Sequence, residues 1–200
     1  MNVRNYFVLL LLLCTSTLSF GQQKAKATEI LEKTATSFRR GEGIHIVFSG
    51  SQKGELKMQG NKFHLLYGGV ESWFDGKTQW SYAADSEEVS ISIPTPEEMQ
   101  ETNPYSIFNT YKTHFNYGYK GIDKNMHKIV LVPLKKDSSI KSITLHISMR
   151  YIPQGIVLSL QNGQRYSFDI TSYSAGKKFD ARTFCYDSKK HPQAEIIDLR

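Results

Sequence analysis

The spacing of apolar residues changes from a helical period to a strand period near residue 43. Between Ala27 and Phe38 the apolar residues recur every three or four positions, as in an amphipathic helix, and Gly41 and Gly43 end this pattern. From residue 44 to residue 93 apolar and polar residues alternate, which predicts strands with one apolar face. The dipeptides between these strands favour tight turns: Gly60-Asn61, Gly68-Gly69 and Asp75-Gly76. We therefore expect an antiparallel meander in this region.

Two helix starts follow the meander. Thr95, Pro96 and Glu98 form the pattern of a capping box with proline at the first helical position. Asn103 before Pro104 provides a second cap, and the apolar residues after it are Tyr105, Ile107, Phe108 and Tyr111. With the helix near the N-terminus, the sequence predicts about three helices.

Strands resume after these helices and continue toward the C-terminus. Alternation predicts them at residues 129–132, 143–149, 155–160 and 165–171, with the hairpin signal Asn162-Gly163 between the last two. Residues 184–186 and 195–199 are expected to be closing strands. The fold class is therefore mainly β, with one curled antiparallel sheet of about ten strands that the helices cover. We find no repeat or long linker that would divide residues 22–200, so we expect a single domain.

Residues 1–21 have the organisation of a cleavable secretory signal peptide. Arg4 precedes an apolar run from Tyr6 to Leu13, and small residues follow up to Gly21. The run is shorter than the roughly 20 residues that a membrane-spanning helix needs. We therefore expect cleavage before Gln22 and export of the remaining chain.

The sequence contains two cysteines, and they lead to different predictions. Cys14 follows an apolar run, so lipidation of this residue, as in bacterial lipoproteins, is the alternative to simple cleavage. Cleavage before Gln22 leaves Cys185 as the single cysteine of the exported chain, which excludes an intramolecular disulfide. The alternating apolar pattern around Cys185 predicts a packed thiol.

Composition narrows the class of protein further. Hydrophobic residues make up 40% of the chain and charged residues 22%, which excludes a disordered chain and a protein with many membrane spans. The aromatic share of 12% favours sheet and broad apolar surfaces. The net charge is +6 without a basic cluster of the nucleic-acid-binding type, so we expect no nucleic-acid partner.

The residues that usually carry catalysis do not form a recognisable motif. No metal-binding or nucleophile motif includes the histidines His45, His64, His114, His127, His146 and His191, and no phosphate-binding glycine loop is present. We therefore expect no enzyme activity, no cofactor and no metal. The adjacent carboxylates Glu87-Glu88 and Glu97-Glu98 leave one alternative open, a hydrolase with dispersed carboxylates.

The strands are expected to direct a set of bulky side chains toward one inner face. These predicted cavity residues are Ile46, Phe48, Leu56, Met58, Phe63, Leu65, Tyr67, Trp80, Tyr82, Ile91, Leu145, Ile147 and Phe168. Periodicity leaves two alternatives for this face, because the side chains of the protein itself or a bound ligand could fill it.

Several segments, in order along the chain, resemble the periplasmic LolA-type outer-membrane lipoprotein carriers. They are the helix ending in Ser37-Phe38, the strand Gly54-Glu55-Leu56 followed by Asn61-Lys62-Phe63, the turn and strand Phe74-Asp75-Gly76-Lys77-Thr78-Gln79-Trp80-Ser81-Tyr82, the segment Asn103-Pro104-Tyr105-Ser106-Ile107-Phe108, and Ile129-Val130-Leu131-Val132-Pro133. The resemblance implies an incomplete antiparallel β-barrel whose helices form a lid over an apolar cavity. The lid's underside would consist of Ile30, Leu31, Ile107, Phe108 and Tyr111.

The resemblance also implies a function and partners. A carrier of this kind is a periplasmic monomer that holds the acyl chains of lipoproteins. It receives them from an inner-membrane lipoprotein-releasing ABC transporter and passes them to an outer-membrane acceptor or to the membrane. Gln59-Gly60 stand where the family has an arginine before a proline, which is thought to latch the lid. This departure keeps a second hypothesis open, a related protein that binds or senses another lipid or apolar ligand.

Overall fold

The computed structural model describes residues 21–36, 42–95, 98 and 107–200. The first 20 residues of the predicted signal peptide, which spans residues 1–21 and includes Cys14, lie outside the described residues. The same holds for Ser37-Phe38 and Asn103-Pro104. Within the described residues, no helix is both long and apolar enough to cross a membrane.

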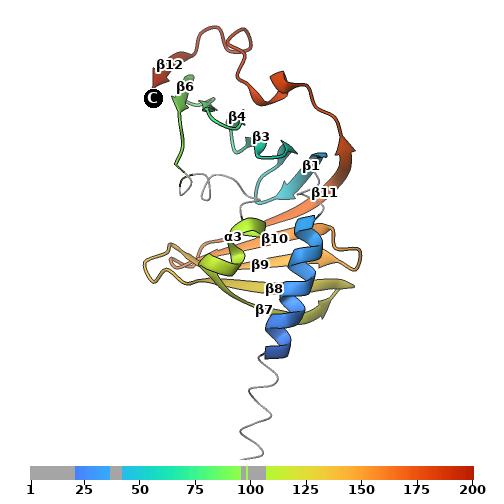
Figure 1. Cartoon of the computed structure of the whole chain (residues 1–200). Coiled ribbons are helices and arrows are strands. Elements are labelled where there is room, and N and C mark those ends of the chain that lie inside the picture. The colour runs from blue at the N-terminus through green and yellow to red at the C-terminus, as the bar shows by residue number, and fades with distance from the viewer. Residues whose placement is uncertain (1–20, 37–41, 96–97, 99–106) are drawn as a thin grey trace, which may run out of the picture.

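A single large sheet dominates the structure (Figure 1). Its strands are β1 Gly43–Gly50, β2 Gly54–Gln59, β3 Lys62–Tyr67, β4 Val70–Phe74, β5 Gln79–Ala83, β6 Glu88–Ser92, β7 Phe115–Asp123, β8 Met126–Pro133, β9 Ile140–Ser148, β10 Pro153–Leu160, β11 Arg165–Lys177 and β12 Glu195–Asp198. Their order is β12-β6-β5-β4-β3-β2-β1-β11-β10-β9-β8-β7, which leaves β12 and β7 at the edges. The sheet is open, as an incomplete barrel requires.

The described sheet has 12 strands, more than the sequence pattern predicted. No strand was predicted at β4 or β7. In β4, Trp73 and Phe74 are both buried, so this strand lacks the simple alternation of a strand with one covered face. All neighbouring strands are antiparallel except β12, which pairs in parallel with β6.

The C-terminal region contains one wrong prediction and one that is confirmed in part. Residues 184–186 do not form a strand, because the chain turns through the short 3-10 helix η1, Ala181–Phe184. The Asp180 side chain starts this turn by accepting a hydrogen bond from the Arg182 backbone N–H at 2.8 Å. The strand predicted at residues 195–199 is present as β12, Glu195–Asp198, which lies at the edge of the open sheet in the parallel direction just described.

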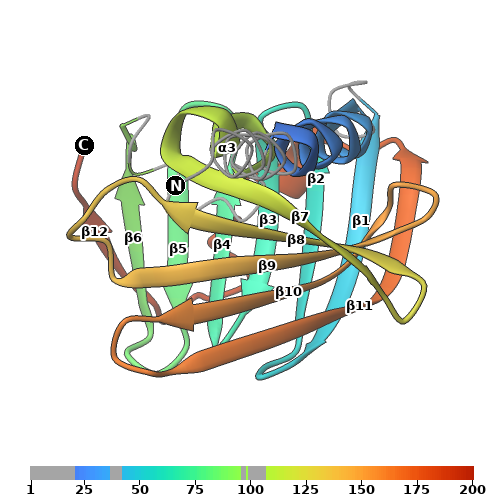
Figure 2. The same ribbon diagram turned by 90° about the horizontal axis from the view of Figure 1, so that it is seen from below.

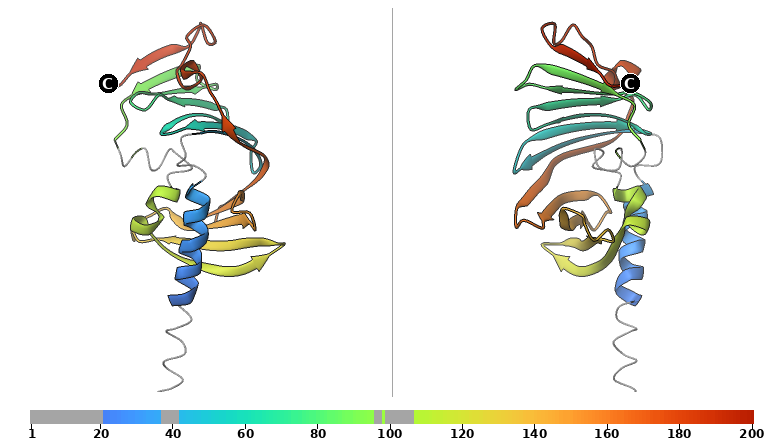
Figure 3. Two further views of the ribbon diagram at one scale, coloured as in Figure 1. Left: turned by 45° about the vertical axis from the view of Figure 1, so that its right-hand side comes forward. Right: turned by 90° about the vertical axis from the view of Figure 1, so that its left-hand side faces the viewer.

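The strands divide into two groups that run in different directions. In Figure 2, β1 to β6 cross β7 to β10, and the long strand β11 of 13 residues links the groups through its pairing with both β10 and β1. The helices of residues 21–36 and α3, Ile107–His114, lie side by side on one face (Figures 2 and 3). We call this face of the sheet the inner face.

The helix of residues 21–36 buries the side that its sequence pattern predicted. Ala27, Ile30 and Leu31 are 0% exposed and Ala35 is 1% exposed. They belong to one apolar cluster with Ile107, Phe108 and Tyr111 of α3 and with inner-face residues of β8 and β9, which are Ile129, Leu131, Leu145 and Ile147. Both helices are therefore part of the hydrophobic core.

The expected lid of three helices is not confirmed. The part of the chain that is described contains two α-helices, and Glu98 adds a helical position between them. The predicted capping box is present, because the Thr95 backbone N–H donates to the Glu98 carboxylate at 2.8 Å and the Glu98 N–H donates to Thr95 Oγ1 at 3.3 Å. Glu98 therefore has the capping role that its sequence pattern predicted.

Candidate ligand-binding site

The register of the strands decides which side chains share the inner face. Residues directly opposite each other on paired strands point to the same side of a sheet. Ile46 pairs with Leu56 and Leu56 with Leu65, so these three lie on one face. The same argument places ten of the predicted cavity residues on the inner face: Ile46, Phe48, Leu56, Met58, Phe63, Leu65, Tyr67, Leu145, Ile147 and Phe168.

The other three predicted cavity residues lie on the outer face, contrary to the expectation of a shared inner surface. Trp80 pairs with Trp73 and with Ile91, and Trp73 pairs with His64, which alternates with Phe63 along β3. Tyr82 is two residues from Trp80 and shares its side. In β5 the inner positions are instead Gln79, Ser81 and Ala83.

The chain after β11, residues 178–200, covers this outer face and explains why apolar residues occur there. We call these residues the C-terminal segment. Tyr82 stacks on His191 with ring centroids 3.8 Å apart, and Trp73 packs against Tyr186 at 5.3 Å. Phe184 of η1 is 2% exposed and Trp73 is 1% exposed. The outer face of β3 to β5 is therefore a second packed layer. Its apolar residues recur at every second position, as those of the inner face do, so the sequence pattern is the same for both faces.

Most of the inner face is filled by the protein itself. Six of the predicted cavity residues are buried in the core cluster: Ile46, Leu56, Met58, Phe63, Leu145 and Ile147. The five predicted lid residues belong to the same cluster. In this structure the central part of the face is therefore packed core.

The other four predicted cavity residues on the inner face are only partly buried, and they form the candidate site. Phe48, Tyr67 and Phe168 make a triangle of rings, with centroid distances of 6.1 Å, 5.9 Å and 5.7 Å. Leu65 lies on the same face, and Phe48 and Leu65 pack against the core cluster. We call Phe48, Leu65, Tyr67 and Phe168 the aromatic rim, an apolar surface that borders the core and remains accessible.

Gly54 allows the aromatic rim to form. It is paired with both Phe48 and Tyr67, and a Cβ at this position would lie 2.2 Å from Cζ of Phe48. The Phe48 ring therefore occupies the space that any other residue would need. This packing gives a physical reason for glycine in the segment Gly54-Glu55-Leu56.

Beyond the rim, the inner face becomes polar. Ser72 pairs with Leu65, Ser81 with Ser72, and Ser90 with Ser81, so serines continue the same row across β4, β5 and β6. The hydroxyls of Ser72 and Ser81 are 3.0 Å apart, and the Ser90 hydroxyl donates to the Ser81 carbonyl at 3.4 Å. The sequence pattern did not predict this row, although Ser90 and Ser92 alternate with apolar residues in β6. The face thus suits a ligand with an apolar part and a polar part.

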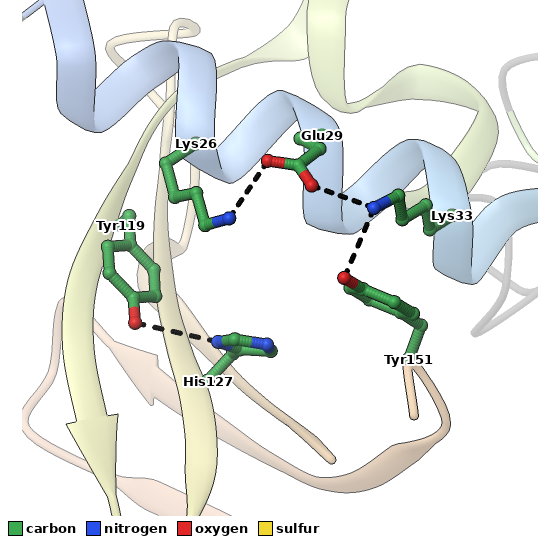
Figure 4. A network of polar contacts seen from close by, with 6 residues as sticks. All are labelled: Lys26, Glu29, Lys33, Tyr119, His127 and Tyr151. Carbon is green, nitrogen blue, oxygen red and sulfur yellow. Dashed lines mark hydrogen bonds and ion pairs between the residues drawn. The ribbon is translucent and has the colours of Figure 1, made fainter. Parts of the chain in front are cut away.

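The helix of residues 21–36 is fastened to its neighbours by polar contacts at its sides (Figure 4). Lys33 donates to the Tyr151 hydroxyl at 3.2 Å and lies over the Tyr151 ring, 4.6 Å from its centroid. Glu29 accepts from both Lys33 and Lys26, which lowers the pKa of this carboxyl group to about 2. Toward α3, the Tyr111 hydroxyl donates to Glu32 at 3.0 Å.

A histidine lies beneath this helix. His127 is 5% exposed, its Nδ1 is 3.5 Å from the Tyr119 hydroxyl, and its ring stacks on Tyr151. Burial lowers the pKa of His127, and Lys26 lowers it further. The neutral imidazole is therefore the favoured form in this position.

Gln59, which the resemblance places at the latch position, contacts another part of the chain. Its side-chain oxygen accepts a hydrogen bond from the Phe179 backbone N–H at 3.2 Å. Phe179 follows β11 and lies in the C-terminal segment. The contacts that fasten the N-terminal helix instead come from Glu32, Lys33 and their tyrosine partners.

The described residues contain no group of three or more histidine, cysteine, aspartate or glutamate side chains that could hold a metal ion. His64 Nε2 is 2.7 Å from the Glu71 carboxylate, and both residues lie on the outer face beneath the C-terminal segment. A ligand on the inner face could therefore make apolar contacts with the aromatic rim and hydrogen bonds with the serine hydroxyls.

Comparison with known proteins agrees with this geometry. The family described as outer membrane lipoprotein carrier protein LolA matches residues 16–164. An uncharacterised conserved protein from Thermus thermophilus has a similar fold, with a TM-score of 0.59, 12% identity, and coverage of 86% of this chain and 99% of that chain. No curated protein matches the sequence.

Two further solved structures have weaker similarity. An outer membrane lipoprotein-sorting protein domain from Vibrio parahaemolyticus gives a TM-score of 0.45 at 10% identity, covering 78% of this chain and 94% of that chain. A LolA superfamily protein from Nitrosomonas europaea gives 0.39 at 10% identity, covering 80% and 98%.

Proposed function

Because this chain belongs to the outer membrane lipoprotein carrier family LolA, we propose that it is a periplasmic carrier that binds the acyl chains of lipoproteins on its inner face. The observation that supports this function is the aromatic rim, an accessible apolar surface that continues into a row of serines. The rings would contact acyl carbons, and the serine hydroxyls would hydrogen-bond to the polar atoms next to the acyl chains.

The physical need for such a site follows from the solubility of lipid chains. Each buried methylene contributes about 0.8 kcal/mol, so a chain of about sixteen carbons costs on the order of 12 kcal/mol to place in water. A protein that covers the chain removes most of this cost during passage through an aqueous compartment. The function requires no covalent chemistry, so the proposal is a binding protein and not an enzyme.

Loading would proceed from the rim toward the packed centre. The rim is accessible, whereas Leu56, Phe63 and their neighbours lie beneath the helices. A long acyl chain would therefore gain further contact area only if the helix of residues 21–36 or α3 shifts away from the sheet. A ligand that prefers the shifted state moves the population toward it. The lipoprotein-releasing transporter and the outer-membrane acceptor would then be the donor and recipient, with one copy of the protein sufficient for each transfer.

Two neighbouring leucines provide a matched test. Leu65 points to the inner face and is part of the rim, whereas Leu66 points outward and is 44% exposed. We expect Leu65→Glu to weaken binding of a fluorescent palmitoylated peptide by about tenfold or more, since a carboxylate would then face the acyl chain. Leu66→Glu should change the affinity by less than about twofold. Circular dichroism checks that both variants fold.

Purification of the unaltered protein identifies its natural ligand. Protein purified from the periplasm should retain acylated protein, detectable by mass spectrometry. Equal peptide binding by folded Leu65→Glu and Leu66→Glu variants would contradict the rim assignment. Recovery of free lipid without any acylated protein would contradict the carrier function and favour a binding or sensing protein for another lipid. The Gln59 contact with Phe179, in place of an arginine latch, is the observation that favours this second function.

A further inference from the structure

The turn between β7 and β8 and the turn between β9 and β10 lie at the same end of the sheet. This follows from the antiparallel pairing of β7 with β8, β8 with β9 and β9 with β10, and it is visible in Figure 2, where both turns project to the right. The two turns and the strand ends beside them carry five exposed residues, Lys120, Ile122, Lys124, Met149 and Arg150. We call this group the basic tip.

The basic tip presents apolar side chains to solvent. Ile122 is 60% exposed and Met149 is 45% exposed. Ile122 owes its position to a bulge, because the register shifts between Tyr119 and Ile122 and Gly121 has a φ of +95°. The shift pairs Ile122 with His127, which turns Ile122 toward the inner face.

The backbone holds these side chains in a defined position. Lys124 and Asn125 have φ values of 47° and 61°, the left-handed pair typical of a tight hairpin turn. Tyr151, directly after Arg150, also has a positive φ of 62°, and its hydroxyl and ring contact Lys33 of the N-terminal helix. The first turn therefore has the conformation of a tight hairpin, and the second is held by the contacts of Tyr151 with the N-terminal helix.

The charge of the basic tip is predominantly positive and is not neutralised within the protein. Asp123 is the one acidic residue in the segments 120–124 and 149–150, and none of Lys120, Lys124 and Arg150 forms an ion pair in the described part of the chain. At the opposite end of the same strands, Lys135 pairs with Asp137 at 3.7 Å. Cations next to exposed apolar side chains match an anionic lipid surface, where the charges meet phosphates and the apolar groups enter the hydrocarbon boundary.

We propose that the basic tip docks this protein on a bilayer of anionic phospholipids, with Ile122 and Met149 inserted between headgroups. Only the purpose of this docking rests on the proposed function. Docking would bring the inner face close to the membrane that donates or accepts the acyl chains. Binding to the bilayer itself requires no cargo.

Sedimentation with vesicles tests this surface. The cargo-free protein should bind vesicles made of equal parts phosphatidylglycerol and phosphatidylethanolamine, and it should remain in solution with vesicles of phosphatidylcholine alone. Ile122→Glu and the double variant Lys120→Glu with Lys124→Glu should each reduce the bound fraction by about tenfold. Raising the salt concentration should also weaken binding, since ions screen exposed charges.

The control is an exposed leucine at the other end of the same strands. Leu134 is 50% exposed and precedes Lys135, so Leu134→Glu makes the same chemical change outside the basic tip. It should leave vesicle binding within about twofold of the unaltered protein. Absence of binding to anionic vesicles at low salt, or an equal loss in Leu134→Glu and Ile122→Glu, would overturn the proposal. The palmitoylated-peptide assay contains no vesicles, so its outcome tests the carrier function separately.

Discussion

His127 is a polar residue in an apolar row. Its neighbours on the inner face of β8 are Ile129 and Leu131, both 0% exposed. The polar and charged groups that face it are Lys26 and Glu29 from the helix, Tyr119 from β7 and Tyr151 from the turn after β9. Since burial lowers the pKa of His127, the unfolded chain binds a proton at this residue more readily than the folded chain does.

This difference predicts a loss of stability on acidification. The free energy of unfolding should fall as the pH drops through about 6.5, the ordinary value for histidine, and should continue to fall until the pH reaches the lower pKa of the folded state. His127→Gln should reduce this fall between neutral pH and pH of about 5, as measured by urea denaturation. His114→Gln, at an exposed position at the end of α3, is the control. An unchanged pH dependence in His127→Gln would contradict the prediction.

The helix of residues 21–36 is the element whose role the structure changes most. The resemblance implied a lid, whereas the observed helix buries Ala27, Ile30 and Leu31 completely and contributes to the same cluster as the strands. Its polar contacts with Tyr151 and Tyr111 lie at the margins of this apolar contact. Any movement of the helix during ligand exchange must therefore expose core residues, and the ligand would have to replace their contacts.

A core role for this helix predicts a large effect of shortening one side chain. Leu31→Ala should lower the free energy of unfolding by about 2–5 kcal/mol, because it removes buried methyl groups and leaves a cavity. Thr36→Ala, at an exposed position of the same helix, should change it by less than about 0.5 kcal/mol. Denaturant unfolding followed by far-ultraviolet circular dichroism measures both values. Equal stabilities for Leu31→Ala and the unaltered protein would show that the helix is a detachable cover.

At the scale of the whole molecule, the two strand groups share one core. The cluster that includes Ile129 and Leu145 beneath the helices continues to Ile46, Leu56 and Phe63 on the other group of strands. β11 pairs with strands of both groups, so hydrogen bonds also cross the boundary. The apolar core and the hydrogen bonds of the sheet therefore both continue from one group of strands to the other.

This continuity predicts a single cooperative unfolding transition. Both tryptophans, Trp73 and Trp80, lie in β4 and β5, so their fluorescence reports on one strand group. Far-ultraviolet circular dichroism reports on the whole sheet. The two signals should change at the same urea concentration, as expected for a two-state transition. Separate midpoints would show that the groups unfold independently.

The sequence by itself determined the local structure of much of this protein. Alternation located most of the strands, and turn dipeptides such as Asn162-Gly163 located hairpins, because these features depend on neighbouring residues. The buried side of the N-terminal helix and the capping box at Thr95 were predictable for the same reason.

Only the tertiary structure decided which apolar face lies against the helices. Alternation gives a strand two faces without saying what covers each one, so Leu65 and Tyr82 had equivalent patterns although they lie on opposite sides. The cover of Tyr82 is His191, a residue distant in sequence, and the parallel pairing of β12 likewise depends on where the C-terminal segment returns to the sheet. Contacts between distant residues also filled the centre of the inner face and left the aromatic rim accessible, which no local pattern encodes.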